Sequence, residues 1–340
     1  MIKSKIIRLV IGIGMVICSF TSLQAQGTMQ VKGRFLYDPR GEKVVLRGVN
    51  EMFIWSSDLT GEKTFPEIAK TGANVVRLVW LSNEDNPKGS PTNLDAIITN
   101  CIKQGLIPMP ELHGATGKWQ NLQKQVDYWT NPEVVKVLKK HQEYLLLNIA
   151  NEVGASEVTD EQFRAAYEEA VSRIRKTGVN CPLIIDGTGW GQNINILQAN
   201  GPYLLTKDPK KNLLFSVHMW WTAPDGAKDR IINEIEESVK MELPLIVGEF
   251  APMGVGCKKY IDHKTIMEQC QKHQIGWLAW SWGLQNNGDC ALMDMTSNEQ
   301  PGKFAGLTDW GLEVAVTDKY SIKNTAQKTS YFKKKVKPGK

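Results

Sequence analysis

Eight short apolar segments rich in β-branched residues recur along the chain, and longer segments with helical periodicity separate them. Continuous apolar segments of this length are typical of strands that are covered on both faces. Strands that alternate with amphipathic helices predict parallel pairing, and eight such units favour a closed (β/α)8 TIM barrel, an α/β fold. The expected strands are residues 44–49, 74–79, 106–112, 144–150, 183–186, 213–218, 245–249 and 277–281. The clearest expected helices are residues 160–176, 228–241 and 264–273.

A doubly wound nucleotide-binding sheet is the alternative architecture. It would place a glycine-rich turn of the G-x-G-x-x-G type after its first strand, and none of the early segments is followed by one. Residues 29–41 instead predict a small β-hairpin that covers the bottom of the barrel. We therefore expect a single barrel domain over residues 26–320, followed by a helix end and a basic tail over 321–340.

The N-terminus predicts export. A positively charged segment (1–8) precedes an apolar segment (9–17) and a small-residue stretch that ends at Ala25, which is the order of a secretory signal peptide covering residues 1–25. The apolar segment is too short to span ~30 Å of hydrocarbon, which argues against a membrane anchor. Bulky Ile17 disfavours lipid attachment to Cys18. We expect a secreted or periplasmic protein that leaves the membrane once the signal is cleaved.

The charge distribution argues against nucleic acid as a partner. The formal net charge of +5 includes three positive charges in residues 1–25 and five lysines in the last eight residues, so the remaining body carries −3. Phosphate binding needs a basic face on the folded body. We therefore expect no nucleic-acid partner, and we expect the protein to be a monomer.

Five cysteines follow the signal segment, and their spacing includes no C-x-x-C motif, which disfavours a zinc or redox site. Three of them lie late in the chain, and an exported protein can oxidise such a pair. Cys257 and Cys290 are one candidate pair between neighbouring loops, although the sequence alone does not fix the connectivity.

Chemically distinctive side chains stand at or just after the carboxyl ends of six of the apolar segments. In a barrel of parallel strands, those ends meet at one rim, where active sites are built. One such residue alone is ordinary, but six positions that converge on one rim predict a functional site. The residues are Arg77, His113, Asn151, Glu152, His218, Glu249 and Trp280.

Two carboxylates at this rim suit cleavage of a glycosidic bond. The reaction needs one protonated carboxyl to protonate the leaving oxygen and a second carboxylate to attack or stabilise the anomeric carbon. Close carboxyls resist ionising together, so one pKa is raised. Arg77 near Glu249 would keep that group charged, whereas Asn151 gives Glu152 no such support. Spacing alone leaves open which glutamate takes which role.

The tryptophans indicate a sugar ligand, because flat indole faces match the apolar faces of pyranose rings. We expect about half of them to be core residues instead. Trp280 is the best candidate for a sugar platform, while Trp277 and Trp310 suit packing. Those near strand ends or the following loops are Trp55, Trp80, Trp119, Trp190, Trp220, Trp221, Trp280 and Trp282.

Several motifs resemble glycoside hydrolase family 5, and longer stretches are similar to its bacterial β-mannanases. The resemblance covers about residues 30–310 and implies a retaining glycosidase with a barrel fold. The family motifs are residues 46–50, 74–77, 151–152 and 248–250. The stretches similar to mannanases are residues 71–74, 111–117, 126–129, 148–152, 189–192, 215–219 and 276–282.

The resemblance implies a role for each rim residue. Glu152 would be the general acid/base, Asn151 would bind the sugar 2-hydroxyl, and Glu249 would be the nucleophile. The other implied residues are Arg77 and His218, which hold the carboxylates, His113, which contacts the sugar at the cleavage site, and Trp280, which forms its floor. The two glutamates supply proton and nucleophile, so we expect no metal and no cofactor.

The chain also departs from the family pattern around this site. Trp220 stands where the family usually has a tyrosine whose hydroxyl meets the nucleophile, and an indole N–H donates one hydrogen bond but accepts none. Val153, Glu51 and the loop over 251–260 differ from mannanases as well. The resemblance implies β-mannan or glucomannan as the substrate, and these departures keep β-glucan as the alternative. An inactive carbohydrate-binding barrel is the alternative from another class.

Overall fold

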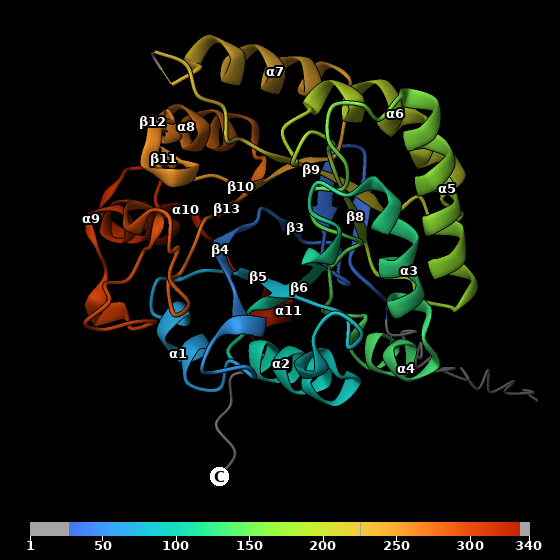
Figure 1. Cartoon of the computed structure of the whole chain (residues 1–340), viewed down its shortest axis with the longest axis horizontal. Helices are drawn as coiled ribbons and strands as arrows, with labels where there is room; N and C mark the ends of the chain where they lie inside the picture. Colours follow the sequence, from blue (N-terminus) through green and yellow to red (C-terminus); the bar gives the residue numbers. More distant parts are fainter. Residues whose placement is uncertain (1–26, 225, 334–340) are drawn as a thin grey trace, which may run out of the picture.

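The computed structural model of the chain describes residues 27–224 and 226–333. Its centre is a closed barrel of eight parallel strands with a ring of helices around it, which confirms the predicted fold (Figure 1). The barrel strands, in order of pairing, are β4 (Arg47–Glu51), β5 (Val75–Trp80), β6 (Ile107–Leu112), β7 (Leu147–Asn148), β8 (Leu183–Asp186), β9 (Leu213–His218), β10 (Leu245–Glu249) and β13 (Gly276–Ala279), which pairs back to β4.

The helices cover the outer face of the barrel because each buries an apolar stripe against the strands. In α5, for example, Phe163, Tyr167 and Ile174 are buried, and Thr159 caps the helix in a capping box with Gln162. The helices are α1 (Thr64–Ala69), α2 (Pro91–Lys103), α3 (Leu122–Thr130), α4 (Pro132–His141), α5 (Asp160–Lys176), α6 (Ile194–Lys207), α7 (Lys228–Lys240), α8 (His263–His273), α9 (Asp309–Leu312), α10 (Ile322–Thr325) and α11 (Ser330–Lys333).

The first barrel strand is displaced from its predicted position. We expected residues 44–49, but β4 extends over Arg47–Glu51, and β3 (Lys43–Val44) belongs to a separate sheet. Polar Asn50 and Glu51 can be buried in the strand because both have partners: the Asn50 amide donates to the Gly248 carbonyl at 3.0 Å, and Glu51 accepts the Leu284 N–H at 3.0 Å. A prediction from hydrophobicity alone therefore placed the end of this strand too early, at residue 49 instead of 51.

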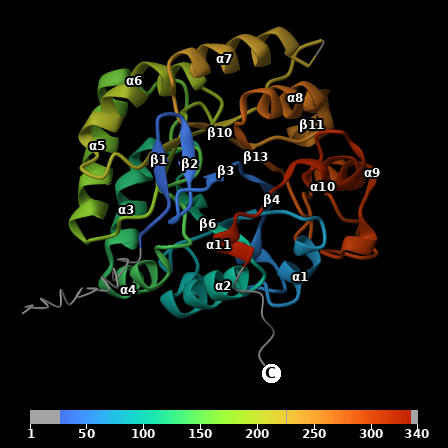
Figure 2. The same cartoon turned by 180° about the vertical axis from the view of Figure 1, so that it is seen from behind.

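The bottom of the barrel is closed by both ends of the described chain. The predicted hairpin is present as β1 (Gln30–Lys32) and β2 (Phe35–Tyr37), and β3 adds a third antiparallel strand. Met29 and Leu36 pack against residues at the strand beginnings, and Phe332 of α11 joins the same apolar cluster. Figure 2 shows this sheet and α11 in front of the barrel.

Two loops at the opposite, upper end are covalently joined. The loop after β10 carries the short pair β11 (Met253–Gly254) and β12 (Lys258–Tyr260), and Cys257 in it forms a disulfide with Cys290 in the loop after β13. The pairing expected as a candidate is therefore present. Cys101, Cys181 and Cys270 are buried free thiols.

Within residues 27–224 and 226–333, no helix is long and apolar enough to cross a membrane. The expected signal peptide and most of the expected basic tail lie outside the described residues.

Candidate active site

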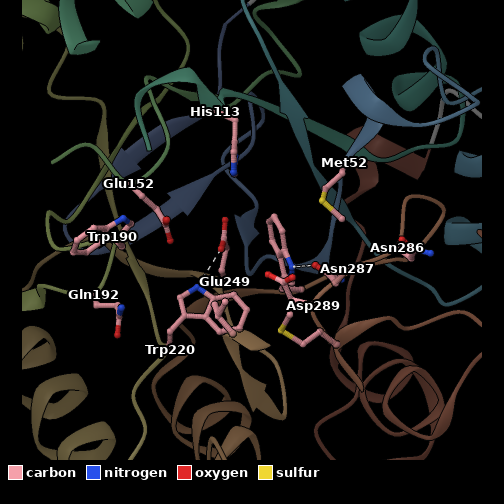
Figure 3. Close-up of a pocket in the computed structure, with 14 residues that line it drawn as sticks. Met52, His113, Glu152, Trp190, Gln192, Trp220, Glu249, Asn286, Asn287 and Asp289 are labelled. Atoms are coloured by element: carbon pink, nitrogen blue, oxygen red, sulfur yellow. Dashed lines mark hydrogen bonds between the residues drawn. The ribbon is translucent and has the colours of Figure 1, made fainter. Parts of the chain in front are cut away.

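The predicted rim residues converge on one pocket at the upper end of the barrel. Strand register brings them together: Arg77 on β5 lies beside Asn50 on β4, and Glu249 on β10 lies beside His218 on β9. The pocket has a volume of about 470 Å³. It is lined by Met52, His113, Glu152, Trp190, Gln192, Trp220, Glu249, Val255, Trp280, Asn286, Asn287, Gly288, Asp289 and Met293 (Figure 3).

Glu152 and Glu249 face each other across this pocket. One oxygen of each carboxyl and one ring nitrogen of His218 all lie within 4.8 Å of one another. The two glutamates are only 8% and 3% exposed. Their spacing is nearer to the ~5–5.5 Å between the carboxyls of retaining glycosidases than to the ~6.5–9.5 Å of inverting ones.

Arg77 is a buried cation that forms an ion pair with Glu249. Its guanidinium donates to Glu249 Oε1 at 2.7 Å and to Asn151 Oδ1 at 2.6 Å. It also donates to Asn148 Oδ1 at 3.0 Å and lies 3.4 Å from Asp186 Oδ2. A fixed, fully paired guanidinium compensates for the cost of burying the Glu249 charge.

His218 bridges the two glutamates. Its Nδ1 lies 2.7 Å from Glu152 Oε1 and 3.4 Å from Glu249 Oε2, while its Nε2 lies 3.5 Å from Asp186 Oδ2. Burial, together with Arg77, lowers the pKa of His218 well below its usual value, so the imidazole is neutral. A neutral ring has one N–H. When Glu152 is protonated, its O–H donates to Nδ1, and the ring N–H then faces Asp186.

The two carboxyls differ in how strongly they hold a proton. Burial raises the pKa of Glu152 well above its usual value, and the nearby carboxylates of Glu249 and Asp186 raise it further. Burial also raises the pKa of Glu249, to about 7, but Arg77 opposes that rise. Glu152 therefore holds its proton more strongly than Glu249, whose charge Arg77 stabilises.

Local backbone geometry aims these side chains at the pocket. Glu152 has a left-handed backbone with φ of 47°, which is costly for a side-chain-bearing residue and is held by its N–H donating to Asp186 Oδ2 at 3.2 Å. Gly248 lets the chain pass closely below the pair, because a Cβ there would clash with Ser216 Oγ and lie 2.8 Å from His218 Nε2. Strand pairing also shifts register between Val247 and Glu249.

Trp220 meets the carboxylate that the family tyrosine was expected to meet. Its indole N–H donates to Glu249 Oε2 at 3.2 Å. This contact supplies the donor that the departure from the family pattern had put in question. The other oxygen, Oε1, accepts from Arg77 at 2.7 Å, so each oxygen of the Glu249 carboxylate has a donor.

The other predicted rim residues lie around the pair. His113 lines the pocket, and its ring centroid lies 6.3 Å from that of Trp280 in a stacked arrangement. Burial opposes protonation of His113, but the Glu111 carboxylate at 2.8 Å from its Nδ1 raises its pKa above the usual value. Trp190 lines the pocket and is 50% exposed. Trp55 is 42% exposed and packs edge-on against His113 at the rim.

The other tryptophans lie within the core or pack against it. Trp80, Trp221, Trp277, Trp282 and Trp310 are buried, as core residues are, while Trp119 packs on Phe163 and Tyr167. The packing roles expected for Trp277 and Trp310 are confirmed.

Sequence reasoning missed four polar residues that support the site. Asn50, Asn148 and Asp186 contact Arg77, and Asn287 accepts the Trp280 indole N–H at 2.7 Å. Asp186 ends an expected strand, so the strand-end rule could have found it. Asn287 lies in a loop whose sequence shows no periodicity that would have singled it out.

Among the described residues, Glu152, His218 and Glu249 form the cluster whose spacing could hold a metal ion. The Arg77 guanidinium already sits 2.7 Å from Glu249, and a second cation beside it would be repelled. The donor set therefore fits proton transfer and nucleophilic attack better than metal binding.

Residues 37–286 match the family model described as Cellulase (glycosyl hydrolase family 5). The chain is a member of glycoside hydrolase family 5. It is thus a glycoside hydrolase. A mannan endo-1,4-beta-mannosidase of Cellvibrio japonicus is 30% identical over 333 residues, which cover 96% of this chain and 75% of that protein. One of Salipaludibacillus agaradhaerens is 30% identical, with 83% and 88% covered.

Solved structures of beta-mannanases share the fold of this chain. A beta-mannanase from Thermomonospora fusca has a TM-score of 0.81 at 29% identity, covering 90% of this chain and 99% of that one. The mannotriose complex of that enzyme has a TM-score of 0.80 at 30% identity, with the same coverage.

Proposed function

We propose that this family 5 glycoside hydrolase is a secreted, retaining endo-β-1,4-mannanase that acts on mannan or glucomannan. The observation that carries the mechanism is the Glu152–Glu249 pair, whose oxygens lie within 4.8 Å in the pocket. Such spacing suits double displacement, in which retaining enzymes hold their carboxyls ~5–5.5 Å apart.

In the first step, Glu152 donates its proton to the glycosidic oxygen while Glu249 attacks the anomeric carbon. The bond to the leaving sugar breaks, and a covalent glycosyl ester forms on Glu249. Arg77 and the Trp220 N–H support this step because they keep Glu249 ionised before attack. Glu152 has the high pKa that a general acid needs.

In the second step, Glu152 is ionised and acts as a base. It takes a proton from a water molecule, whose oxygen attacks the anomeric carbon and releases Glu249 as a carboxylate. Two inversions give net retention of the anomeric configuration. Loss of the negative charge on Glu249 in the intermediate removes its repulsion of Glu152, so the pKa of Glu152 falls when a base is needed.

Mannan is the proposed substrate because relatives over most of the chain bear the name mannan endo-1,4-beta-mannosidase. Solved complexes of the Thermomonospora fusca enzyme contain mannotriose and mannohexaose. The proposed contacts are His113, Asn151 and Trp280 at the cleavage site, with Trp55 and Trp190 along the chain of sugars.

The second candidate is an endo-β-1,4-glucanase that uses the same residues. A relative named Beta-mannanase/endoglucanase A, from Caldicellulosiruptor saccharolyticus, is 26% identical over 78% of this chain and 20% of that protein. Its name combines both activities, which keeps the glucanase as the second candidate.

Release of reducing ends tests the substrate directly. Galactomannan, glucomannan, carboxymethylcellulose, mixed-linkage glucan and xylan would be compared at equal mass. We expect the highest rates on the two mannans, with retained configuration in the first product seen by NMR. A preference for the two glucans would replace the mannanase by the glucanase, and binding without hydrolysis would favour a carbohydrate-binding barrel.

Substitution of each glutamate tests the assigned roles. Glu249→Ala should lower kcat by more than about 10⁴-fold while sugar binding persists, because no other carboxylate can form the ester. Glu152→Ala should regain activity with azide on substrates that carry good leaving groups. Glu237→Ala, which removes an exposed glutamate on α7, is the matched control. Near-normal turnover by Glu249→Ala would show that the nucleophile lies elsewhere.

A further inference from the structure

One side of the pocket is formed by two loops that the catalytic steps do not use. Val255 comes from the loop after β10, and Asn286, Asn287, Gly288, Asp289 and Met293 come from the loop after β13. Together they are six of the 14 lining residues, and we call them the cleft wall. The loop after β10 is also one of the places where this chain departs from the mannanase pattern.

The cleft wall lies at the end of the pocket away from the proposed acid. In Figure 3, Glu152, Trp190 and Gln192 lie on one side of Glu249, and Asn286, Asn287 and Asp289 lie on the other. A general acid must stand beside the leaving oxygen. The leaving sugars therefore extend past Glu152 toward Trp190, and the sugars that remain bound to Glu249 extend toward the cleft wall.

Buried polar contacts fix the cleft wall to the barrel. The Glu51 carboxylate accepts the backbone N–H groups of Leu284 at 3.0 Å and Gln285 at 3.3 Å. Asp294 Oδ1 accepts the backbone and side-chain N–H groups of Asn287, at 2.9 and 2.6 Å. Asn287 in turn accepts a hydrogen bond from the Trp280 indole N–H. The cleft wall and Trp280 are therefore fixed relative to each other.

The Cys257–Cys290 disulfide joins the two loops of the wall. Cys290 is buried, whereas Cys257 is exposed to solvent and to reductants. The loop that carries Val255 otherwise depends on the short β11–β12 pair, which belongs to no larger sheet. A covalent link of this kind restricts the positions that an exposed loop can take.

Asp289 is the charged group of this wall. Its side chain is exposed in the pocket, next to the disulfide, and among the described residues no cation lies within ion-pair distance of it. An unpaired carboxylate accepts two hydroxyl hydrogen bonds from a neutral sugar, and such charge-assisted bonds are the strong ones. It also repels an acidic sugar at the same place.

We propose that Asp289, held in place by the Cys257–Cys290 link, is a specificity-determining residue that binds the hydroxyls of the sugar beyond Trp280 on the non-reducing side. This inference rests on the proposed function, because the direction of the substrate follows from Glu152 as acid. It assigns the disulfide a role in substrate affinity in addition to any role in stability.

The experiment compares two substrates that differ only on the non-reducing side: nitrophenyl β-mannoside and nitrophenyl β-mannotrioside. For Asp289→Asn and for Cys257→Ser/Cys290→Ser, KM for the trioside should rise about tenfold more than KM for the mannoside, with kcat on the trioside within about twofold. Glu299→Gln, which removes an exposed carboxylate outside the pocket, is the matched control. Equal losses on both substrates, or no change in the KM ratio, would overturn the proposal.

Reduction of the wild-type enzyme gives a second measurement in case the serine variant folds poorly. Dithiothreitol should raise KM for the trioside in the wild type and should leave the serine variant unaffected. If reduction leaves the trioside KM of the wild type unchanged while thiol titration shows that the link is open, the disulfide has no such role. Failure of the proposed function is seen separately, because the untreated wild type would then hydrolyse neither substrate.

Discussion

At the scale of single residues, Trp220 shows how one side chain can keep a function with different chemistry. Its N–H donates to Glu249 Oε2 at 3.2 Å, which is the kind of bond a tyrosine hydroxyl would donate. A donor stabilises the ionised carboxylate and so lowers its pKa. The indole also lines the pocket and packs edge-on against Trp280, with ring centroids 6.3 Å apart. A tyrosine ring is smaller and would cover less of the Trp280 side chain.

Removal of this donor should move the acidic limb of the pH–rate profile. We expect a bell-shaped kcat/KM, with Glu249 titrating on the acidic limb and Glu152 on the basic limb. Trp220→Phe loses the N–H, so the pKa of Glu249 should rise and the acidic limb should shift to higher pH. At a fixed acidic pH, kcat/KM should fall by about tenfold. Profiles measured over a range of pH check this.

Trp220→Tyr is the matched variant for that measurement, since a hydroxyl can donate to the same oxygen. It should keep the acidic limb close to its wild-type position. Should the phenylalanine and tyrosine variants shift the limb equally, the effect would belong to the indole ring and not to its N–H.

At the scale of elements, the site depends on how closely β9 and β10 approach each other. Ser216 and His218 of β9 face Gly248 of β10, and the register shift beside Gly248 turns Glu249 toward the pocket. The absence of a side chain at Gly248 therefore sets the position of the His218 ring below the glutamate pair.

Gly248→Ala should thus impair catalysis more than folding. The added methyl group would displace His218, which lies 2.7 Å from Glu152, and kcat should fall by at least about 100-fold. KM and the melting temperature should change much less, because the barrel can shift a side chain more easily than a strand. Ile246→Val, which trims the same strand near the bottom cluster, is a suitable control. Comparable losses of kcat in both variants would contradict this account.

Sequence patterns predicted the strands best where apolar segments were uninterrupted. The segments 183–186, 213–218 and 245–249 coincide with β8, β9 and β10. The segment 144–150 narrowed to Leu147–Asn148, although Leu146 and Ile149 on either side still donate backbone hydrogen bonds to the neighbouring segments. The β4 strand gained Asn50 and Glu51, whose backbone partners at Gly248 and Leu284 come from 198 or more residues away and leave no local signal.

The same limit applies to the site. Strand-end positions were enough to bring Glu152 and Glu249 into one pocket with Arg77 behind them, because barrel topology fixes where those ends meet. The orientation of Trp220 and the place of Asn287 depend on loops, whose course is set by contacts such as the Cys257–Cys290 link. No periodicity encodes those contacts.

At the scale of the whole molecule, stability and activity are divided between the two ends of the barrel. The upper end holds buried charges and strained backbone, both of which cost stability. The lower end is closed by the N-terminal sheet and by Phe332, which share one apolar cluster. Tyr144 packs against Phe332 with ring centroids 6.0 Å apart.

A substitution at the lower end should therefore affect stability alone. Phe332→Ala removes a buried aromatic side chain and should lower the free energy of unfolding by about 3 kcal/mol. The kcat and KM at a temperature well below the transition should stay at wild-type values. Urea denaturation and steady-state kinetics check the two halves of this prediction, and a change in kcat would reveal coupling through the barrel.

Because β1 and α11 both cover the lower face, either end of the described chain can be tethered without obstructing the mouth (Figure 2). On a bead, a cell surface or a neighbouring module, the enzyme would be presented with its pocket outward. The mouth of the pocket would then be the part of the enzyme that first meets an insoluble polymer. The placement of two terminal segments thus makes the molecule suitable for immobilisation in one productive orientation.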